Sequence, residues 1–213
     1  QIEMCYGYRG FVAKRDVCAR LHEPNMYIAS PFADLLFENR FCKMPAMTLP
    51  KGALVDVGFS EQEPRYGFVV LPGKRVYYIH KRHLAPLEAP KKGEEETRSS
   101  IAQAALAFLG TQYRWGGRTH AGIDCSGLVF TAYALNGIPL YRDAVFEKSP
   151  NVREIPFEDA REGDLLYFKG HIALCLGDGA YVHASASQGC VCTGRFGDGG
   201  LEREQILHVG TVF

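Results

Sequence analysis

A cysteine stands at the start of a segment with helical character, in the stretch GIDCSGLVFTAYALNG at residues 122–137. The thiolate is the reactive form of cysteine, and the N–H groups and positive dipole end of a helix N-terminus stabilise it. Asp124 is a suitable N-cap, Gly127 leaves room for another element, and the backbone N–H of Cys125 is placed to help hold an oxyanion. The pattern predicts a nucleophile at Cys125. The alternative interpretation is a small buried hydrophobic residue.

A nucleophilic thiol needs a general base, and the chain has seven histidines. His171 and His183 differ from the others because they bracket a hairpin, HIALCLGDGAYVHA. A two-residue turn at 178–179 would place them on opposite faces, since side chains alternate along a strand. A three-residue loop at 177–179, which its glycines favour, or an equivalent bulge would place both on one face. We predict this second register, with the two histidines close together.

The seven cysteines follow no recognisable metal or disulfide pattern. Their number is odd, no CxxC pair occurs, and CVC at 190–192 is too tight for a zinc knuckle. A zinc ion on His171, His183 and Cys175 would have to share their face with Cys125, and no HxxxH spacing supports one. We therefore expect no metal and no other cofactor. Mostly buried free thiols are the simplest interpretation, and they favour the cytoplasm.

Elements that would position these residues follow one another along the second half of the chain. Apolar residues recur at helical spacing from Ile101 to Leu109, and a second helix is predicted over 125–135. Four β-rich runs come next: DLLYFKG, HIALCLG, AYVHASA and ILHVGTVF. Helices followed by several antiparallel strands predict an α+β domain over 101–213.

The first part of the chain has a different character. Short β-rich runs between glycines and prolines, such as GALVDVGF and RYGFVVLPG, predict a small all-β domain over 1–88. VLPGKRVYYI is typical of a hairpin. The polar stretch at 89–100, which changes from KK to EEE, is the best candidate for a linker between the two domains.

Composition excludes some classes of function. The 213 residues contain 24 Lys+Arg and 24 Asp+Glu, so no strong field exists to attract nucleic acid. No apolar run is long enough to span a bilayer. The chain starts at Gln1 instead of Met, so we expect that a signal peptide or an initiator segment has been removed.

Five segments in order, YRWGG, DCSGLV, GDLLYF, HIALCLGDG and YVHAS, resemble the NlpC/p60 cell-wall cysteine peptidases. This family is a circularly rearranged branch of the papain-like fold, and the resemblance covers residues 100–213. It implies Cys125 as the nucleophile, His171 as the general base and His183 as the residue that orients the base. It also implies that Tyr113 lies near the oxyanion site.

The resemblance implies a substrate class as well. Family members hydrolyse the amide between γ-D-glutamate and meso-diaminopimelate or L-lysine in peptidoglycan stem peptides. Asp124 and Ser126 would contact the substrate backbone, and the protein would act as a monomer. Its substrate would be either released peptides inside the cell or wall fragments after export.

The segment PLYRDA at 139–144 resembles a narrower subset, the γ-D-glutamyl-L-diamino acid peptidases. There an aspartate binds a free N-terminal amine, and Asp143 occupies that place. A carboxylate opposite an ammonium separates a free L-Ala terminus from one that is amide-linked. The alternative is that Asp143 pairs with Arg142 or caps a turn. The region before Pro90 is similar to bacterial SH3-like β-barrels, which in this subset add an acidic residue and a tyrosine to the pocket. Glu38 and Tyr78 are the candidates.

Other interpretations use the same residues. An amidase or acyltransferase would use the same Cys–His pair, and a wall-binding module would combine the SH3-like domain with an inactive catalytic domain. The intact set of Cys125, His171 and His183 argues against the binding module. A structural or redox protein is disfavoured, because the cysteines of this chain are odd in number and scattered, which is not typical of a disulfide framework.

Overall fold

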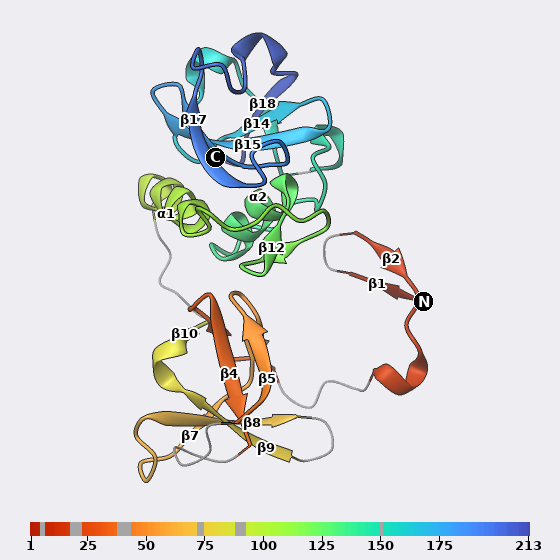
Figure 1. Ribbon diagram of the computed structural model, residues 1–213, viewed down its shortest axis with the longest axis vertical. Coiled ribbons are helices and arrows are strands. Elements are labelled where there is room, and N and C mark those ends of the chain that lie inside the picture. The colour runs from red at the N-terminus through yellow and green to blue at the C-terminus, as the bar shows by residue number, and fades with distance from the viewer. Residues whose placement is uncertain (5–6, 18–22, 38–43, 72–74, 88–92, 150) are drawn as a thin grey trace. The chain divides into compact units, whose positions relative to one another are not determined.

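The structure is a computed structural model that describes residues 1–4, 7–17, 23–37, 44–71, 75–87, 93–149 and 151–213. The chain divides into two compact units, each with its own apolar core (Figure 1). The first comprises Gln1–Ile2 and Gly10–Lys91, and the second comprises Glu3–Arg9 and Lys92–Phe213. The candidate catalytic residues all belong to the second unit.

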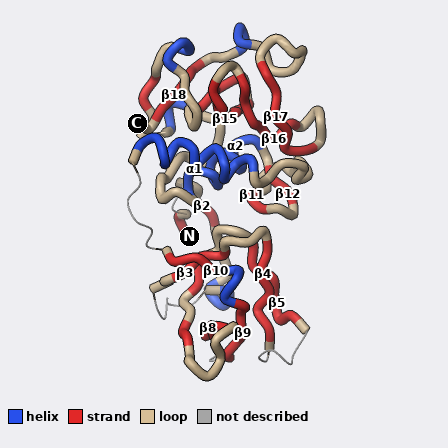
Figure 2. The backbone as a smooth tube through the Cα atoms, turned by 90° about the vertical axis from the view of Figure 1, so that its left-hand side faces the viewer, coloured by secondary structure: helices blue, strands red, loops and turns tan. Residues whose placement is uncertain are grey.

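The second unit is built from two α-helices and a six-stranded antiparallel sheet in the order β13-β18-β14-β15-β16-β17. Figure 2 shows the two helices beside one another against this sheet, and both contact β15. The α+β arrangement predicted from the sequence is confirmed. The elements are α1 (Glu94–Leu106), β11 (Arg118–Thr119), β12 (Gly122–Ile123), α2 (Cys125–Ala134), η3 (Phe146–Lys148), β13 (Arg153–Glu154), η4 (Phe157–Asp159), β14 (Leu165–Phe168), β15 (His171–Gly177), β16 (Ala180–Ser185), β17 (Cys190–Arg195), η5 (Arg203–Gln205) and β18 (His208–Thr211).

Both faces of the central strands are buried, as the apolar run of β14 shows with all four residues enclosed. Leu165 and Tyr167 pack with Leu128 of α2 in one cluster. Leu166 and Phe168 point the other way and pack in a second cluster, which residues from the connecting segments complete. Because side chains alternate along a strand, one sheet supports two cores and is held firmly from both faces.

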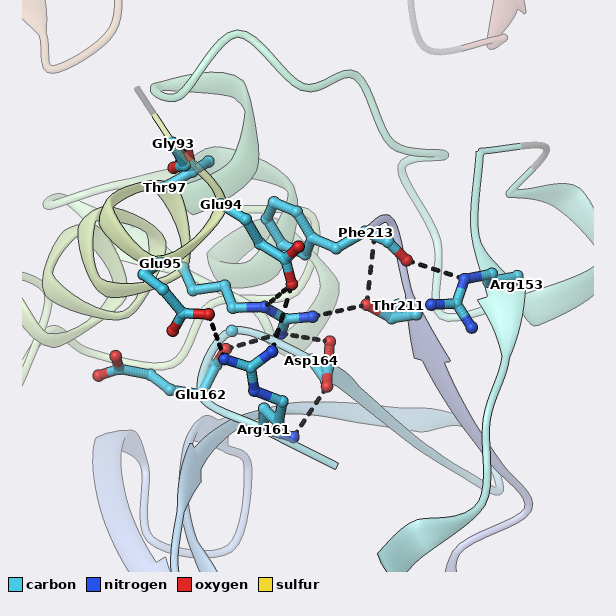
Figure 3. Close-up of polar contacts among 12 residues, drawn as sticks. Gly93, Glu94, Glu95, Thr97, Arg153, Arg161, Glu162, Asp164, Thr211 and Phe213 are labelled. Atoms are coloured by element: carbon cyan, nitrogen blue, oxygen red, sulfur yellow. Dashed lines mark hydrogen bonds and ion pairs between the residues drawn. The ribbon is translucent and has the colours of Figure 1, made fainter. Parts of the chain in front are cut away.

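The buried guanidinium of Arg98 ties α1 to the sheet. Figure 3 labels its partners Glu94, Asp164 and Thr211. The guanidinium donates to Oδ1 of Asp164 at 2.8 Å, to Oε1 of Glu94 at 2.9 Å and to Oγ1 of Thr211 at 3.2 Å. The ring of Phe213 lies 4.3 Å from the guanidinium carbon. Since a buried charge without its partner is costly, these contacts fix where α1 packs.

Helix α1 begins at Glu94, inside the segment 89–100 that the sequence predicts as a linker. Its N-cap is Gly93, and Glu94, Glu95 and Glu96 fill its first turn, where the helix dipole favours negative charge. The acidic stretch that suggests a linker is therefore the start of a helix. Residues 88–92 lie outside the described residues.

The first unit contains a five-stranded sheet in the order β5-β4-β9-β8-β7 and a three-stranded sheet in the order β10-β3-β6. Ile28, Leu35 and Ile79 are fully enclosed in its core. The pairing of β8 with β9 confirms the predicted hairpin, whose turn at 72–74 lies outside the described residues. The elements of this unit are η1 (Lys14–Asp16), β3 (Met26–Ile28), β4 (Phe32–Leu36), β5 (Pro45–Pro50), β6 (Leu54–Val55), β7 (Gly58–Phe59), β8 (Tyr66–Leu71), β9 (Arg75–His80), η2 (Lys81–His83) and β10 (Leu84–Pro86). Strands β1 (Ile2–Glu3) and β2 (Arg9–Gly10) pair with one another, and each spans a boundary between the two units.

The SH3-like barrel predicted for residues 1–88 is not shown. Over the described part of this region, the strands form separate sheets that do not close into a barrel. What the structure shows is the coarser feature, a β-rich unit with a small core of its own.

Candidate active site

Cys125 is the first residue of α2, as the sequence predicts. Asp124 caps the helix, because its Oδ1 accepts the N–H of Gly127 at 2.6 Å. Cys125 is only 8% exposed, and it lies at the helix end where N–H groups and the dipole favour a negative charge. The position therefore suits a nucleophile that is largely shielded from bulk water.

Several influences act on the pKa of the Cys125 thiol, and their sum raises it. Burial raises the pKa most, and the backbone N–H of Ile172 lowers it. The charge of Asp124 raises the pKa, whereas the N–H groups of Ser126 and of Cys125 itself lower it. The influence of Ile172 places the sulfur against the start of β15, next to His171. The resting thiol is protonated, and a base stands in the neighbouring strand.

His171 and His183 form a hydrogen-bonded pair. Nε2 of His171 lies 2.8 Å from Nδ1 of His183, and the two ring centroids are 5.0 Å apart. Burial, followed by the neighbouring His183, lowers the pKa of His171 to about 4, and burial also lowers the pKa of His183. Both rings are neutral at neutral pH. His171 accepts a proton on Nδ1 when its Nε2–H donates to His183.

A bulge in β15 brings the two histidines onto one face. At the hairpin tip, residue 177 pairs with residue 180, but Cys175 pairs with Tyr181, so β15 contains one extra residue. The shift places His183 opposite position 173, on the same face as His171. The prediction of an odd-length loop or an equivalent bulge is confirmed in its second form.

A buried arginine holds the residues around the nucleophile. Nη1 of Arg142 donates to Oδ1 of Asp124 at 3.0 Å and to Oγ of Ser126 at 2.7 Å. Nη2 donates to Oδ2 of Asp124 at 2.9 Å and to the carbonyl of Gly117 at 3.1 Å. Arg142 thus joins the start of α2 to the glycine-containing loop before it. Sequence reasoning did not identify this role, although the adjacent Arg-Asp pair in PLYRDA was a signal.

These bonds give Asp124 a structural role that the sequence did not predict. Both of its carboxylate oxygens bind groups of the protein itself, including the N–H of Gly116 at 2.7 Å, and Asp124 is 7% exposed. Its carboxylate holds the loop and the helix start together, and its predicted contact with the substrate backbone remains a prediction. Ser126 shares the same arginine, and its predicted contact with the substrate remains a prediction.

Tyr113 lies close to the nucleophile. Burial raises the pKa of its hydroxyl, and the neighbouring Cys125, when ionised, and Asp124 raise it further. The backbone of the loop is fixed as well, because the N–H of Tyr113 donates to the carbonyl of Gly189 at 2.7 Å. The predicted place of Tyr113 at the oxyanion site is consistent with this neighbourhood.

Asp143 accepts a hydrogen bond from the hydroxyl of Tyr8, a residue 135 positions earlier in the chain. Residues 3–9 group with the second unit, so this contact lies within the catalytic unit. The bond to Asp143 and burial raise the pKa of Tyr8 to about 12. Arg142 binds Asp124, so the alternative of an Arg142–Asp143 ion pair is not what the structure shows. Tyr8 carried no signal in the sequence.

The predicted pocket roles of Glu38 and Tyr78 remain predictions. Glu38 lies outside the described residues. Tyr78 is half-buried in β9 of the first unit, opposite Phe68 and Leu36. Among the described residues no group of three or more His, Cys, Asp or Glu side chains is arranged to hold a metal ion. None of the described helices is both long and apolar enough to cross a bilayer.

Comparisons with known proteins agree with this geometry. Residues 110–205 match the model of the NlpC/P60 family. A dipeptidyl-peptidase 6 of Lysinibacillus sphaericus is 35% identical over 195 residues, which cover 86% of this chain and 72% of that protein. A γ-D-glutamyl-L-lysine dipeptidyl-peptidase of Bacillus subtilis is 34% identical over 103 residues, which cover 45% of this chain and 34% of that protein.

A solved structure supports the fold. The crystal structure of an NlpC/P60 family protein from Bacillus cereus superposes with a TM-score of 0.73 at 23% identity, covering 88% of this chain and 62% of that chain. The chain thus spans less than two thirds of this protein and of the Bacillus subtilis relative. The family model covers the predicted nucleophile and both histidines, and the Lysinibacillus relative aligns along most of its own length. The chain belongs to the NlpC/P60 family.

Proposed function

We propose that this protein is a cysteine peptidase that hydrolyses the bond between γ-D-glutamate and a diamino acid in peptidoglycan stem peptides. The observation that carries the proposal is the arrangement of Cys125, His171 and His183. The thiol lies at a helix N-terminus against the strand that begins with His171. Nε2 of His171 is hydrogen-bonded to Nδ1 of His183 at 2.8 Å. The names of the relatives support the substrate class.

The mechanism uses these groups in sequence. Nδ1 of His171 accepts the proton of Cys125, and the thiolate attacks the γ-carbonyl carbon of D-glutamate. The backbone N–H of Cys125 and the hydroxyl of Tyr113 stabilise the oxyanion. His171 then gives its proton to the departing amine of the diamino acid as the C–N bond breaks. A water molecule, deprotonated by His171, hydrolyses the thioester and restores the thiol.

Asp143 is the proposed determinant of substrate length. Its carboxylate binds the free ammonium of an N-terminal L-Ala, and an amide-linked terminus lacks that charge. The substrate is then a released peptide in preference to one still attached to a glycan. The first unit is proposed to be an SH3-like domain that assists substrate binding, with its β-rich sheets as support.

The test compares two tripeptides, L-Ala-γ-D-Glu-meso-diaminopimelate and its N-acetylated form, on wild type, Cys125→Ala and Cys175→Ala. Cys175 is a matched control because it is buried too, in the cluster on the other face of the sheet. We expect preferential cleavage of the free tripeptide, a loss of at least about a thousand-fold in Cys125→Ala and little change in Cys175→Ala.

Other outcomes lead elsewhere. Equal cleavage of both tripeptides would keep the peptidase and remove the role of Asp143 in reading the amine. An amidase or acyltransferase on the same Cys–His pair would leave both tripeptides intact. Full activity of Cys125→Ala would exclude the proposed nucleophile.

A further inference from the structure

Two cysteines on strand β17 take no part in the proposed reaction. Cys190 and Cys192 are free thiols, both half-buried, and Val191 between them packs into the apolar core of the second unit. Because side chains alternate along a strand, the two thiols lie on the same face of β17. Burial raises the pKa of Cys192, and an ionised Cys190 raises it further, so the two sulfurs are near neighbours.

The backbone of β17 is held in place from both sides. Along its whole length it pairs with β16, and Cys192 lies directly opposite His183. On the other side, the N–H of Val191 donates to the carbonyl of Thr111 at 2.9 Å, and the carbonyl of Val191 accepts the N–H of Gly110 at 2.9 Å. The strand is therefore kept extended, which places the Cα atoms of the two cysteines about 6.6 Å apart.

This spacing decides what the two thiols can bind together. In a disulfide the Cβ atoms lie about 3.8 Å apart. On one face of an extended strand they are nearly as far apart as the Cα atoms, so a disulfide between these two cysteines would distort β17. A metal–thiolate bond is about 2.3 Å long, so an ion bound in line between two thiolates holds the sulfurs about 4.6 Å apart. The two side chains reach that separation by leaning slightly towards one another.

The number of ligands selects the class of ion. Zinc in a structural site takes four ligands, and no group of three or more His, Cys, Asp or Glu side chains in the described part of the chain is arranged to hold a metal ion. Copper(I) prefers soft thiolate ligands and is stable with two of them in line. We propose that Cys190 and Cys192 form a two-thiolate site for a soft monovalent metal ion of the copper(I) class.

Binding exchanges protons for the ion. Each thiol releases its proton, and two sulfur–copper bonds form with no change in oxidation state. The bound group carries one net negative charge and lies next to His183, on an outer strand of the sheet. Since both sulfurs are only half-buried, the ion can enter from solvent. The site is separate from the proposed nucleophile, so it can be tested without a substrate.

The experiment measures copper(I) binding to the full-length chain under anaerobic conditions, in competition with a colorimetric copper(I) chelator. Wild type is compared with Cys190→Ser, Cys192→Ser and the double variant, since serine offers a hard oxygen in place of the soft sulfur. Cys175→Ala is the matched control, because it removes a free thiol of the same unit that has no second cysteine on its strand. Urea denaturation checks that each variant is folded.

In wild type we expect the pair to bind one copper(I) ion with the release of two protons. Each single variant should lose at least about 100-fold in affinity, because even changes outside the ligands of a metal site cost up to about that much. The double variant should lose no more than either single variant, since the two thiols act as a unit. Cys175→Ala should bind copper(I) as wild type does.

Three results would overturn the proposal. Unchanged affinity in the double variant means that the ion binds elsewhere in the chain. A loss confined to one single variant, or divided equally between the two, means that the thiols do not hold one ion together. An equal loss of affinity in Cys175→Ala means that the substitutions act through the fold and not through a shared ligand pair.

Discussion

The proposed proton transfer from Cys125 to His171 runs against the pKa shifts of both residues. Burial raises the pKa of the thiol and lowers that of the imidazole, so the resting pair is neutral. Transfer creates two opposite charges side by side in a shielded place, and their attraction offsets part of the cost of burying each. The helix N-terminus and the N–H of Ile172 stabilise the thiolate further.

At the residue scale, the pKa of His171 predicts the pH dependence of the reaction. His171 accepts a proton only when neutral, and its pKa of about 4 lies below the usual 6.5. We expect kcat/KM for the free tripeptide to be retained as pH falls below 6.5 and to be lost as pH falls through about 4. An acid limb centred near 6.5 would contradict this. His183→Ala removes a neighbour that lowers this pKa, so its acid limb moves upward.

In the proposed mechanism, His183 orients the base through its hydrogen bond to Nε2 of His171. We expect His183→Ala to lower kcat about 100-fold with little change in KM, because His171 is no longer held in the reactive orientation. His183→Asn, which keeps an acceptor, should retain more of the activity. Equal kcat values for the two variants would show that His183 acts only as packing.

Sequence reasoning was most successful in placing the candidate catalytic residues within the fold. Cys125, His171 and His183 follow from a helix start and a hairpin, both of which are local patterns. Tyr8 and Arg142 did not follow, because their roles depend on contacts made only when distant segments pack together. No periodicity encodes such contacts.

At the element scale, α2 depends on the glycine in its first turn. A Cβ on Gly127 would lie 2.2 Å from the carbonyl oxygen of Gly117 and 2.9 Å from Oδ1 of Asp124. We expect Gly127→Ala to lower the free energy of unfolding by about 1–3 kcal/mol in urea denaturation, since backbone must move. At Gly93, which has open space around it, the same change should cost less than about 1 kcal/mol. Similar costs at both sites would disprove the steric explanation.

The position of α1 depends on the ion pair between Arg98 and Asp164. Arg98→Met leaves the carboxylate of Asp164, which is fully buried, without its cation. We expect the free energy of unfolding to fall by about 3–5 kcal/mol, measured by urea denaturation. Arg161→Gln, which breaks only exposed ion pairs of α1, should cost at most about 1 kcal/mol. A small effect of Arg98→Met would mean that packing alone holds the helix.

The elements themselves were predictable to different degrees. Helix α2 and strands β14, β15, β16 and β18 follow from apolar patterns, whereas the start of α1 was missed because its first turn is acidic and faces solvent. Strand β17 was missed because its sequence CVCTGR alternates too weakly to indicate a strand. Its place in the sheet comes from pairing with β16.

At the scale of the whole molecule, two separate cores predict unfolding in more than one step. We expect the calorimetric enthalpy of thermal unfolding to exceed the van't Hoff enthalpy. Arg98→Met should lower the transition of the second unit and leave that of the first where it is. A single transition with equal enthalpies would show that the two units unfold as one.

The bulge between Cys175 and Gly177 sets the face on which the two histidines meet. A single residue inserted within one paired strand, with no second bulge to compensate, turns the side chains beyond it to the opposite face of the sheet. A residue inserted at the hairpin tip only lengthens the loop, because β14 and β17 hold the two strands in register from their outer sides. The proposed histidine pair therefore constrains the register of the two strands and leaves the length of the loop between them free.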